Sequence, residues 1–253
     1  MRGAPRVLPA FPPFAMNPLH EPKIVPALGF KSLTPIYDFA MAATMREGTF
    51  RPALVDQAAI LPGQDILDLA CGTGTLATMI GARVAGTRLS GLDADPQILA
   101  IAQRKAAAAG VLVRFDHGFS NRLPYPDDSF DRIVSSLFFH HLSLRHKHET
   151  AAEVLRVLRP GGELHIADWG RATSWLMRVL FVPVQLLDGF PNTRDNVSGR
   201  LPFILEDSGF AGVLQTDTFS TMFGTLALYR ASKPAVATAP APAVTATKRD
   251  AIP

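Results

Sequence analysis

DLACGTGTLA, at residues 68–77, carries the residues that decide the fold of this chain. Gly72, Gly74 and Ala77 fit the G-x-G-x-x-A pattern, in which glycines let the loop between a strand and a helix pass close to a nucleotide. Dinucleotides place their pyrophosphate at the N-terminus of that helix, where backbone N–H groups create a positive potential. Asp68 would put a carboxylate close to the pyrophosphate, and like charges at short range repel each other. The stretch therefore predicts a strand–loop–helix unit whose ligand carries no phosphate.

A nucleoside cofactor with cationic groups instead of phosphates would favour a carboxylate at this position. S-adenosylmethionine (SAM) is such a cofactor, because its methionyl end carries an ammonium and a sulfonium. Asp93 closes the next predicted strand and can accept hydrogen bonds from ribose hydroxyls, which SAM and NAD both have. Two simpler interpretations stay open: Asp93 could cap the helix that follows it, and the two glycines could form no more than a tight turn.

Strands and helices are predicted to alternate on both sides of this loop. Such alternation predicts βαβ units, a doubly wound and mainly parallel sheet with helices on both faces, and a ligand site at the carboxyl ends of the strands. The first five strands are expected at 65–70, 88–95, 111–118, within 130–139 and at 163–170, and the helices among them at 37–60, 75–84, 97–110 and 147–162.

The last third of the chain departs from this alternation. An apolar, helix-like segment at 174–190 leads to a polar stretch at 191–200 and then to a helix at 201–210. Two strands follow at 212–220 and 225–232, and the residues between them are too few for a helix, so these strands must be antiparallel. A parallel sheet that ends in a reversed hairpin is not the fold of a simple NAD-binding domain.

Composition limits the partners of the chain. With 253 residues and a net charge of +3, it has an ordinary globular composition, and we expect a small-molecule substrate, no nucleic-acid partner and no integral membrane segment. Peripheral contact with lipid and the oligomeric state stay open. The single cysteine, Cys71, excludes an intramolecular disulfide and favours the cytoplasm, and no metal site is predicted. A proline-rich, disordered leader is expected at 1–33, the folded domain at 34–232 and a disordered Ala/Pro/Thr-rich tail at 233–253.

Four segments occur in order along the chain: ILDLACGTGTLA, LSGLDADPQILAIA, LPYPDDSFDRIVSS, and HHL followed by EVLRVLRPGGELHIAD. Together they resemble the class I SAM-dependent methyltransferases, especially the branch that contains the ubiquinone- and menaquinone-biosynthesis C-methyltransferases. The resemblance covers about residues 35–232. It implies a Rossmann-like, seven-stranded α/β sheet with a terminal antiparallel hairpin, and SAM as the cofactor.

The resemblance also implies roles for individual residues. Ala70 stands where the family most often has a glycine, and Phe119 stands where it often has an acidic residue that contacts the adenine amino group. Phe119 could flank the adenine or pack in the core, while the Ser120 N–H remains available to a ring nitrogen. The residues implied to contact the cofactor are Tyr37, Asp68, Ala70, Gly72, Gly74, Asp93, Ala94, Phe119, Ser120, Ser136 and Leu137.

Methyl transfer requires alignment of the acceptor and exclusion of water, and it requires a base only where the acceptor arrives protonated. His140, His141 and Asp168 follow the fourth and fifth strands and are the candidates. We expect His140 to be the base, because histidine titrates near neutral pH, and His141 to be structural. Trp169 and the segment 175–187 could line an aromatic or lipid-like substrate, or the segment could pack as a core-facing helix.

The leading hypothesis is a SAM-dependent methyltransferase that acts on a quinone-precursor ring or a related lipophilic acceptor. A phospholipid amine is the alternative acceptor. Two other classes of protein stay open. One is a nicotinamide-dependent oxidoreductase, against which Asp68 and the terminal hairpin argue. The other is a SAM-fold binding protein without catalysis, which Phe119 and the lack of an unmistakable base favour.

Overall fold

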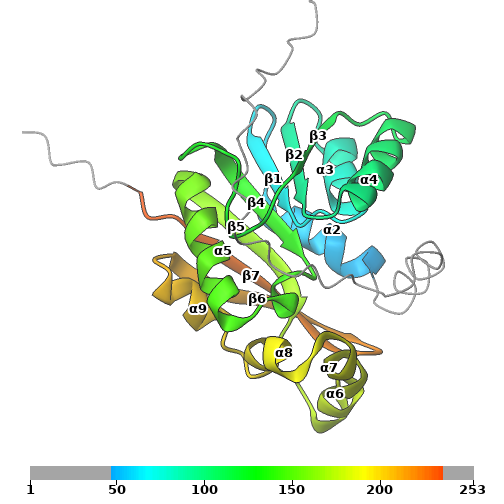
Figure 1. Ribbon diagram of the computed structural model, residues 1–253, viewed down its shortest axis with the longest axis vertical. Coiled ribbons are helices and arrows are strands. Elements are labelled where there is room, and N and C mark those ends of the chain that lie inside the picture. The colour runs from blue at the N-terminus through cyan, green and yellow to red at the C-terminus, as the bar shows by residue number, and fades with distance from the viewer. Residues whose placement is uncertain (1–46, 236–253) are drawn as a thin grey trace, which may run out of the picture.

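The computed structural model describes residues 47–235. The predicted cofactor residue Tyr37 and the expected leader lie outside the described residues. Seven strands form one sheet in the order β3-β2-β1-β4-β5-β7-β6 (Figure 1). The strands are β1 (Asp65–Leu69), β2 (Arg88–Asp93), β3 (Val113–His117), β4 (Phe130–Ser136), β5 (Leu158–Trp169), β6 (Ala211–Thr221) and β7 (Gly224–Ser232).

The sheet has the predicted mixed topology. Strands β3, β2, β1, β4 and β5 run parallel to one another. Strand β7 lies between β5 and β6 and is antiparallel to both. The doubly wound α/β fold with a reversed terminal hairpin is therefore confirmed. The parallel order also brings the loops after β1, β2, β4 and β5 to one edge of the sheet, which we call the carboxyl edge.

Helices cover both faces of the sheet (Figure 1). Helices α5 and α9 contribute to the buried cluster on one face, and α2 and α3 to the cluster on the other. No helix among residues 47–235 is both long and apolar enough to cross a bilayer. The helices are α2 (Glu47–Ala58), α3 (Thr75–Arg83), α4 (Pro96–Ala108), the 3-10 helix η1 (Phe139–His141), α5 (Leu144–Val157), α6 (Trp175–Leu180), α7 (Val182–Asp188), α8 (Phe190–Val197) and α9 (Leu201–Asp207).

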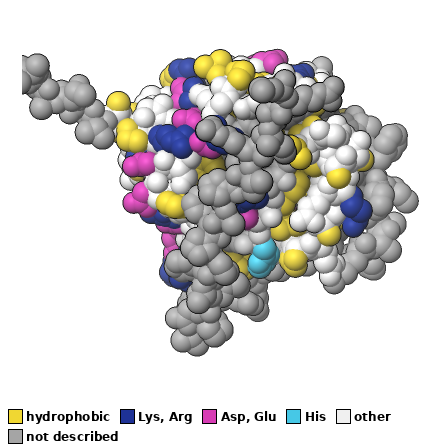
Figure 2. All heavy atoms as spheres, turned by 90° about the horizontal axis from the view of Figure 1, so that it is seen from above, with side chains coloured by type: hydrophobic (Ala, Val, Ile, Leu, Met, Phe, Trp, Pro, Cys, Tyr) yellow, Lys and Arg dark blue, Asp and Glu magenta, His cyan; other side chains and the backbone are white. Residues whose placement is uncertain are grey.

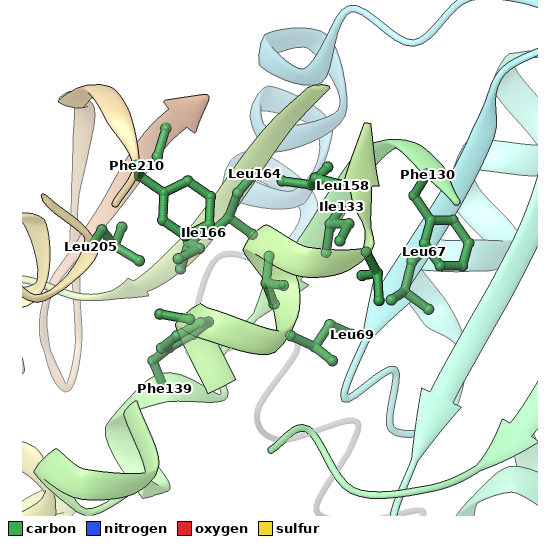
Figure 3. Packing of buried hydrophobic residues seen from close by; sticks show 14 of the residues in the cluster. Leu67, Leu69, Phe130, Ile133, Phe139, Leu158, Leu164, Ile166, Leu205 and Phe210 are labelled. Atoms are coloured by element: carbon green, nitrogen blue, oxygen red, sulfur yellow. The ribbon is translucent and has the colours of Figure 1, made fainter. Parts of the chain in front are cut away.

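Side chains of the central strands alternate between the two clusters, because successive residues of a strand point to opposite faces of a sheet. In β1, Leu67 and Leu69 belong to the cluster beside α5 and α9 (Figure 3). Ile66 belongs to the cluster beside α2 and α3. Asp68 shares the parity of Ile66, so the alternation directs its carboxylate toward α3 and the glycine loop that opens it.

The structure corrects the expected end of the helix at 147–162. Helix α5 ends at Val157, and residues 158–162 belong to β5. The cause is Pro160, because a proline disfavours the helical conformation of the residue before it, here Arg159.

The segment 174–200 also differs from its prediction. The single apolar helix is broken at Phe181 into α6 and α7, since Pro183 at the start of α7 has no N–H to donate to the preceding turn. The stretch 191–200, expected only as polar, forms most of α8 and has Pro191 in its first turn, where that N–H is not needed.

Candidate active site

Three residues in the loop after β1 have left-handed backbone conformations, and each has a different structural role. Gly72 has φ +52°, and a Cβ built on it would meet nothing within 4 Å, so its backbone faces open space. Gly74 has φ +73°, and a Cβ there would lie 2.8 Å from Cβ of Ala102, so this glycine lets α3 pack on α4. Ala70 also has φ +55°, a conformation that costs a residue with a Cβ about 1–2 kcal/mol. That geometry accounts for the glycine that the family most often has at this position.

Asp68 lies behind this loop as a buried acid. The residue is 2% exposed, and its Oδ2 accepts a hydrogen bond from the Ala77 N–H at 2.9 Å, in the first turn of α3. Burial raises the pKa of this carboxyl to about 7, although the bond from Ala77 and the charge of Arg51 oppose the shift. The side chain therefore changes charge near neutral pH, and a cation bound close by would favour its ionised form.

Asp93 connects the glycine loop to the end of β2. Its Oδ2 accepts from the Gly72 N–H at 2.9 Å and its Oδ1 from the Asp95 N–H at 3.0 Å. The cap of α4 is Asp95, which accepts from the N–H groups of Gln97 and Ile98, so the alternative interpretation of Asp93 as that cap is wrong. Each oxygen of Asp93 keeps acceptor capacity for a hydroxyl group.

The residues expected beside the adenine follow β2 and β3 at the carboxyl edge. The carbonyl of Ala94 lies 3.0 Å from Nε2 of His117. The ring of Phe119 meets His117 edge-on, with centroids 6.0 Å apart. The Ser120 hydroxyl lies 2.8 Å from Oγ1 of Thr150. Ala94, Phe119 and Ser120 are all partly buried. The neighbouring strands β2 and β3 therefore bring these three residues to the carboxyl edge, where Asp93 also lies.

The end of β4 carries a buried hydroxyl to which no described residue forms a hydrogen bond. The Ser136 Oγ is buried and has no hydrogen-bond partner among the described residues. Leu137 follows with φ +56°, and its N–H donates to the Ala167 carbonyl at 2.8 Å. Buried polar atoms are nearly always partnered, so an exception beside an open backbone loop points to a ligand.

His140 forms a buried pair with Asp168, the last residue but one of β5. Its Nδ1 lies 2.6 Å from Oδ1 of Asp168, and its backbone N–H donates to Oδ2 at 3.2 Å. Burial raises the pKa of Asp168, but the imidazole of His140 and the bonds from the surrounding N–H groups together hold it below its usual value. A carboxylate that accepts the Nδ1 proton leaves the Nε2 lone pair of His140 as the basic site.

Asp188, at the end of α7, faces this lone pair. Its Oδ2 lies 3.6 Å from Nε2 of His140, and its Oδ1 lies 3.6 Å from Nδ1 of His141. One ligand atom from each of these three residues lies within 4.8 Å of the other two, which is a spacing that a divalent metal ion could occupy. The arrangement can therefore serve either proton transfer or metal binding, and the sequence predicted no metal here.

A second group of buried polar side chains attaches α8 to α5 and to the end of β5. Lys147 is fully buried, donates to the Asn192 carbonyl at 2.6 Å and lies 3.5 Å from Asp195. Asn196 donates to the Trp169 carbonyl at 3.3 Å. The sequence pattern did not single out Asp188 or Lys147. Asp188 could have been noticed as the only acid in the apolar segment 174–190, whereas Lys147 lies in a basic run typical of an exposed helix.

These features fit SAM without adjustment of the residues present. The open backbone at Gly72, the remaining acceptor capacity of Asp93 and the unpartnered Ser136 hydroxyl lie on adjacent strands in the order β2-β1-β4. SAM has ribose hydroxyls and a methionyl end, which can form hydrogen bonds with such groups. The fold and these features together fit the class of the Rossmann-like, class I SAM-dependent methyltransferases.

Comparison with known proteins finds a methyltransferase domain and relatives that are methyltransferases. Residues 66–162 match the family described as "Methyltransferase domain". The demethylmenaquinone methyltransferase of Thermus thermophilus is 37% identical over 145 residues, which cover 55% of this chain and 64% of that protein. The demethylmenaquinone methyltransferase of Deinococcus radiodurans is 34% identical over 155 residues, covering 60% of this chain and 63% of that protein. The chain thus spans less than two thirds of the length of these relatives.

A solved structure of low sequence identity shares the fold. The SAM-dependent methyltransferase structure from Methanosarcina mazei superposes with a TM-score of 0.57 at 21% identity, covering 70% of this chain and 95% of that one. At this identity the likeness concerns the fold alone. The comparisons thus show a methyltransferase domain at residues 66–162 and the fold of the class I SAM-dependent methyltransferases, whose cofactor is S-adenosylmethionine.

Proposed function

We propose that this protein transfers the methyl group of SAM to a small, lipophilic or aromatic acceptor of the quinone-precursor kind. The observation that carries the proposal is the His140–Asp168–Asp188 group at the same edge of the sheet as the Gly72–Asp93 loop. The similarity to the two demethylmenaquinone methyltransferases supports the acceptor class.

The chain's own residues would hold the cofactor from two sides. Asp93 would accept bonds from the ribose hydroxyls while its bond to Gly72 keeps the loop closed around it. Asp68 and Ser136 would lie toward the methionyl end, one supplying negative charge from behind the loop and the other a hydroxyl. SAM, when bound, supplies the methyl group on a positively charged sulfur. Ala94, Phe119 and Ser120 would surround the adenine.

The proton of the acceptor would go to His140. Asp168 holds the imidazole in the tautomer that leaves Nε2 free, as its 2.6 Å contact with Nδ1 requires. A proton accepted at Nε2 is stabilised by Asp188, 3.6 Å away. A phenol or an enol-type carbon acid needs such a base, whereas an amine that arrives neutral does not. The base therefore favours a ring acceptor over a phospholipid amine.

The first test separates the classes of cofactor. Calorimetry should show binding of SAM and S-adenosylhomocysteine and none of NAD. A response to NAD alone would overturn the proposal and favour the oxidoreductase.

The second test identifies the acceptor. The protein is incubated with methyl-labelled SAM and a lipid extract of its host, and the extract is separated into quinone and phospholipid fractions. We expect the label in a quinone-like ring product. Label in a phospholipid headgroup would show instead that the acceptor is a phospholipid amine. Tight SAM binding with no labelled product would show that the protein binds SAM without catalysis.

A further inference from the structure

Helices α6 and α7 and the start of α8 expose an unusual number of apolar side chains. None of the six residues of α6 is buried. Trp175 is 78% exposed, Leu186 69% and Leu187 79%. The exposed apolar residues of this α6–α8 face are Trp175, Leu176, Val179, Val182, Leu186, Leu187 and Phe190. Soluble proteins rarely leave so many large apolar side chains uncovered in one short segment unless the surface has a partner.

These side chains are not the ones that attach the helices to the sheet. Phe181, between α6 and α7, is buried, and its ring lies 4.9 Å from that of Trp169 at the end of β5. Gln185 is buried in α7 and donates to the Thr193 hydroxyl of α8 at 3.1 Å. The helices are therefore anchored through one side, and their apolar residues on the other side are free to contact something else.

The exposed charges of the same segment are all positive. Within residues 171–200, Arg171, Arg178, Arg194 and Arg200 are exposed, whereas the two acids are half-buried (Asp188) and buried (Asp195). Arg171, Arg178 and Arg194 take part in no ion pair between described residues. By contrast, the face shown in Figure 2 has acidic and basic side chains side by side.

We propose that the α6–α8 face binds the surface of an anionic lipid bilayer. Tryptophan and leucine side chains that enter the headgroup region, flanked by arginines that meet lipid phosphates, are the composition of an interfacial helix. A second copy of the chain fits this face less well. A symmetric dimer would bring the face against itself, and its only exposed charges would then repel each other.

The face is connected to the active site through α7. That helix begins at the exposed Val182 and ends at Asp188, which faces His140. A lipophilic acceptor could thus leave the bilayer next to the base, a consequence that rests on the proposed function. Binding to the bilayer itself does not rest on it, because it is measured without SAM.

The experiment uses the full-length protein and vesicles of phosphatidylcholine with and without phosphatidylglycerol. The chain has two tryptophans, Trp169 at 2% exposure and Trp175 at 78%, so a change in fluorescence on binding reports on Trp175. We expect flotation with the anionic vesicles, a blue shift of the emission, and quenching by brominated lipid. Trp175→Phe should abolish the shift while most of the binding remains.

Matched variants test the two parts of the face. Arg178→Glu with Arg194→Glu should weaken binding to anionic vesicles by at least about 25-fold, at about fivefold per arginine lost. Leu186→Ser with Leu187→Ser should abolish quenching. The controls are Arg104→Glu and Leu112→Ser, which change an exposed arginine and a leucine that is 92% exposed on the other half of the sheet.

Several outcomes would overturn the inference. Absence of flotation would do so, as would equal losses in the two control variants. A blue shift that grows with protein concentration in the absence of vesicles would show that a second copy covers the face instead.

Discussion

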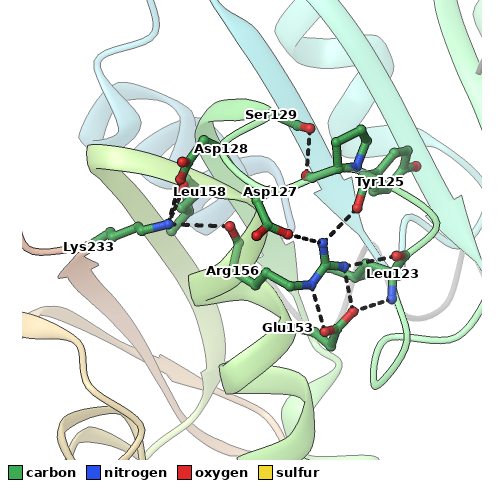
Figure 4. Close-up of polar contacts among 10 residues, drawn as sticks. Leu123, Tyr125, Asp127, Asp128, Ser129, Glu153, Arg156, Leu158 and Lys233 are labelled. Carbon is green, nitrogen blue, oxygen red and sulfur yellow. Dashed lines mark hydrogen bonds and ion pairs between the residues drawn. The ribbon is translucent and has the colours of Figure 1, made fainter.

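The two edges of the sheet use polar side chains in opposite ways. At the edge where the parallel strands begin, charged groups satisfy one another. Asp65 pairs with Arg88 and Arg159, and Arg159 also pairs with Asp131 at 2.6 Å. A second network centres on Arg156 (Figure 4). Its guanidinium donates to Glu153 and Asp127 and to the carbonyls of Tyr125 and Leu123.

The carboxyl edge holds buried polar groups with capacity to spare. Asp68 is buried with one bond from Ala77, the Ser136 hydroxyl has no partner among the described residues, and Nε2 of His140 faces Asp188 at 3.6 Å. Burying polar groups in this state costs free energy. A ligand that completes their bonding would offset this cost, so we expect the carboxyl edge to bind the ligand and the amino edge to stabilise the fold.

Backbone strain alone does not distinguish the two edges. Within residues 47–235, four residues other than glycine have positive φ: Ala59, Ala70, Asp128 and Leu137. Ala59 and Asp128 lie in exposed turns near the amino ends of the strands, whereas Ala70 and Leu137 are partly buried at the carboxyl edge. The candidate site differs from the amino edge because strained backbone, burial and polar atoms with spare hydrogen-bonding capacity occur there together.

The largest effect is expected from His140→Asn. The amide nitrogen of asparagine can still donate to Asp168, so the protein should fold, but the basic Nε2 is lost. We expect kcat to fall by about 10²–10⁴-fold with an unchanged Kd for SAM, measured by transfer of labelled methyl and by calorimetry. EDTA should leave the wild-type rate unchanged. A rate that EDTA abolishes and zinc restores would instead assign His140, His141 and Asp188 to a metal ion.

Asp93→Asn should have the next largest effect, and it acts on binding. Hydrogen bonds to a charged group contribute about 1.5–3 kcal/mol, so Kd for SAM should rise by about 10- to 100-fold. The matched control is Asp95→Ala, which removes the cap of α4 and should cost about 1 kcal/mol of unfolding free energy without weakening SAM binding. Unchanged affinity in Asp93→Asn would remove the ribose assignment.

The raised pKa of Asp68, about 7, predicts a pH dependence of cofactor binding. Below that pH the carboxyl is protonated in the free protein, and binding a cationic ligand must release the proton. The affinity for SAM should therefore increase as pH rises from about 5.5 to about 7.5, by up to about tenfold per unit below the pKa. The same raised pKa favours the folded state while the carboxyl is protonated, so this group's contribution to stability falls as pH rises from about 4 to about 7. Asp68→Asn should remove the slope in affinity, and a slope that survives this variant would contradict the assigned role.

The sequence predicted the fold and the edge of the sheet where the candidate residues lie better than the contacts among those residues. Asp68, Gly72 and Asp93 could be proposed because a glycine loop and strand-ending acids are local patterns. The hydrogen-bond partners of these residues could not be predicted, because the Gly72–Asp93 contact joins residues 21 positions apart. Asp188 was missed for the same reason: its role depends on α7 folding back to η1 beyond the end of β5, and no local pattern encodes that distance.

Arg156→Met tests the amino edge. Removing the guanidinium leaves Glu153 with only the bond from the Leu123 N–H and takes this donor from the carbonyls of Leu123 and Tyr125. We expect the free energy of unfolding in urea to fall by about 2 kcal/mol. SAM affinity and kcat should change by less than about twofold. Arg145→Met, on the same helix, is the control, because its side chain is 80% exposed and its pair with Glu149 should contribute about 0.5 kcal/mol or less. A large loss of SAM affinity in Arg156→Met would erase the distinction between the edges.

The smallest effect is expected from Ala70→Gly, and it sharpens the comparison of strained residues. Glycine relieves about 1–2 kcal/mol of left-handed strain but gains about 0.4–1 kcal/mol of unfolded-state entropy, so the protein should become more stable by about 0.5 kcal/mol. Ala59→Gly, at the exposed end of α2, should give a similar gain. Only Ala70→Gly should also alter the Kd for SAM, by about threefold or less, because only Ala70 lies in the loop that Asp93 holds through Gly72. Equal effects of the two variants on SAM binding would show that the strain at Ala70 has no part in shaping the cofactor loop.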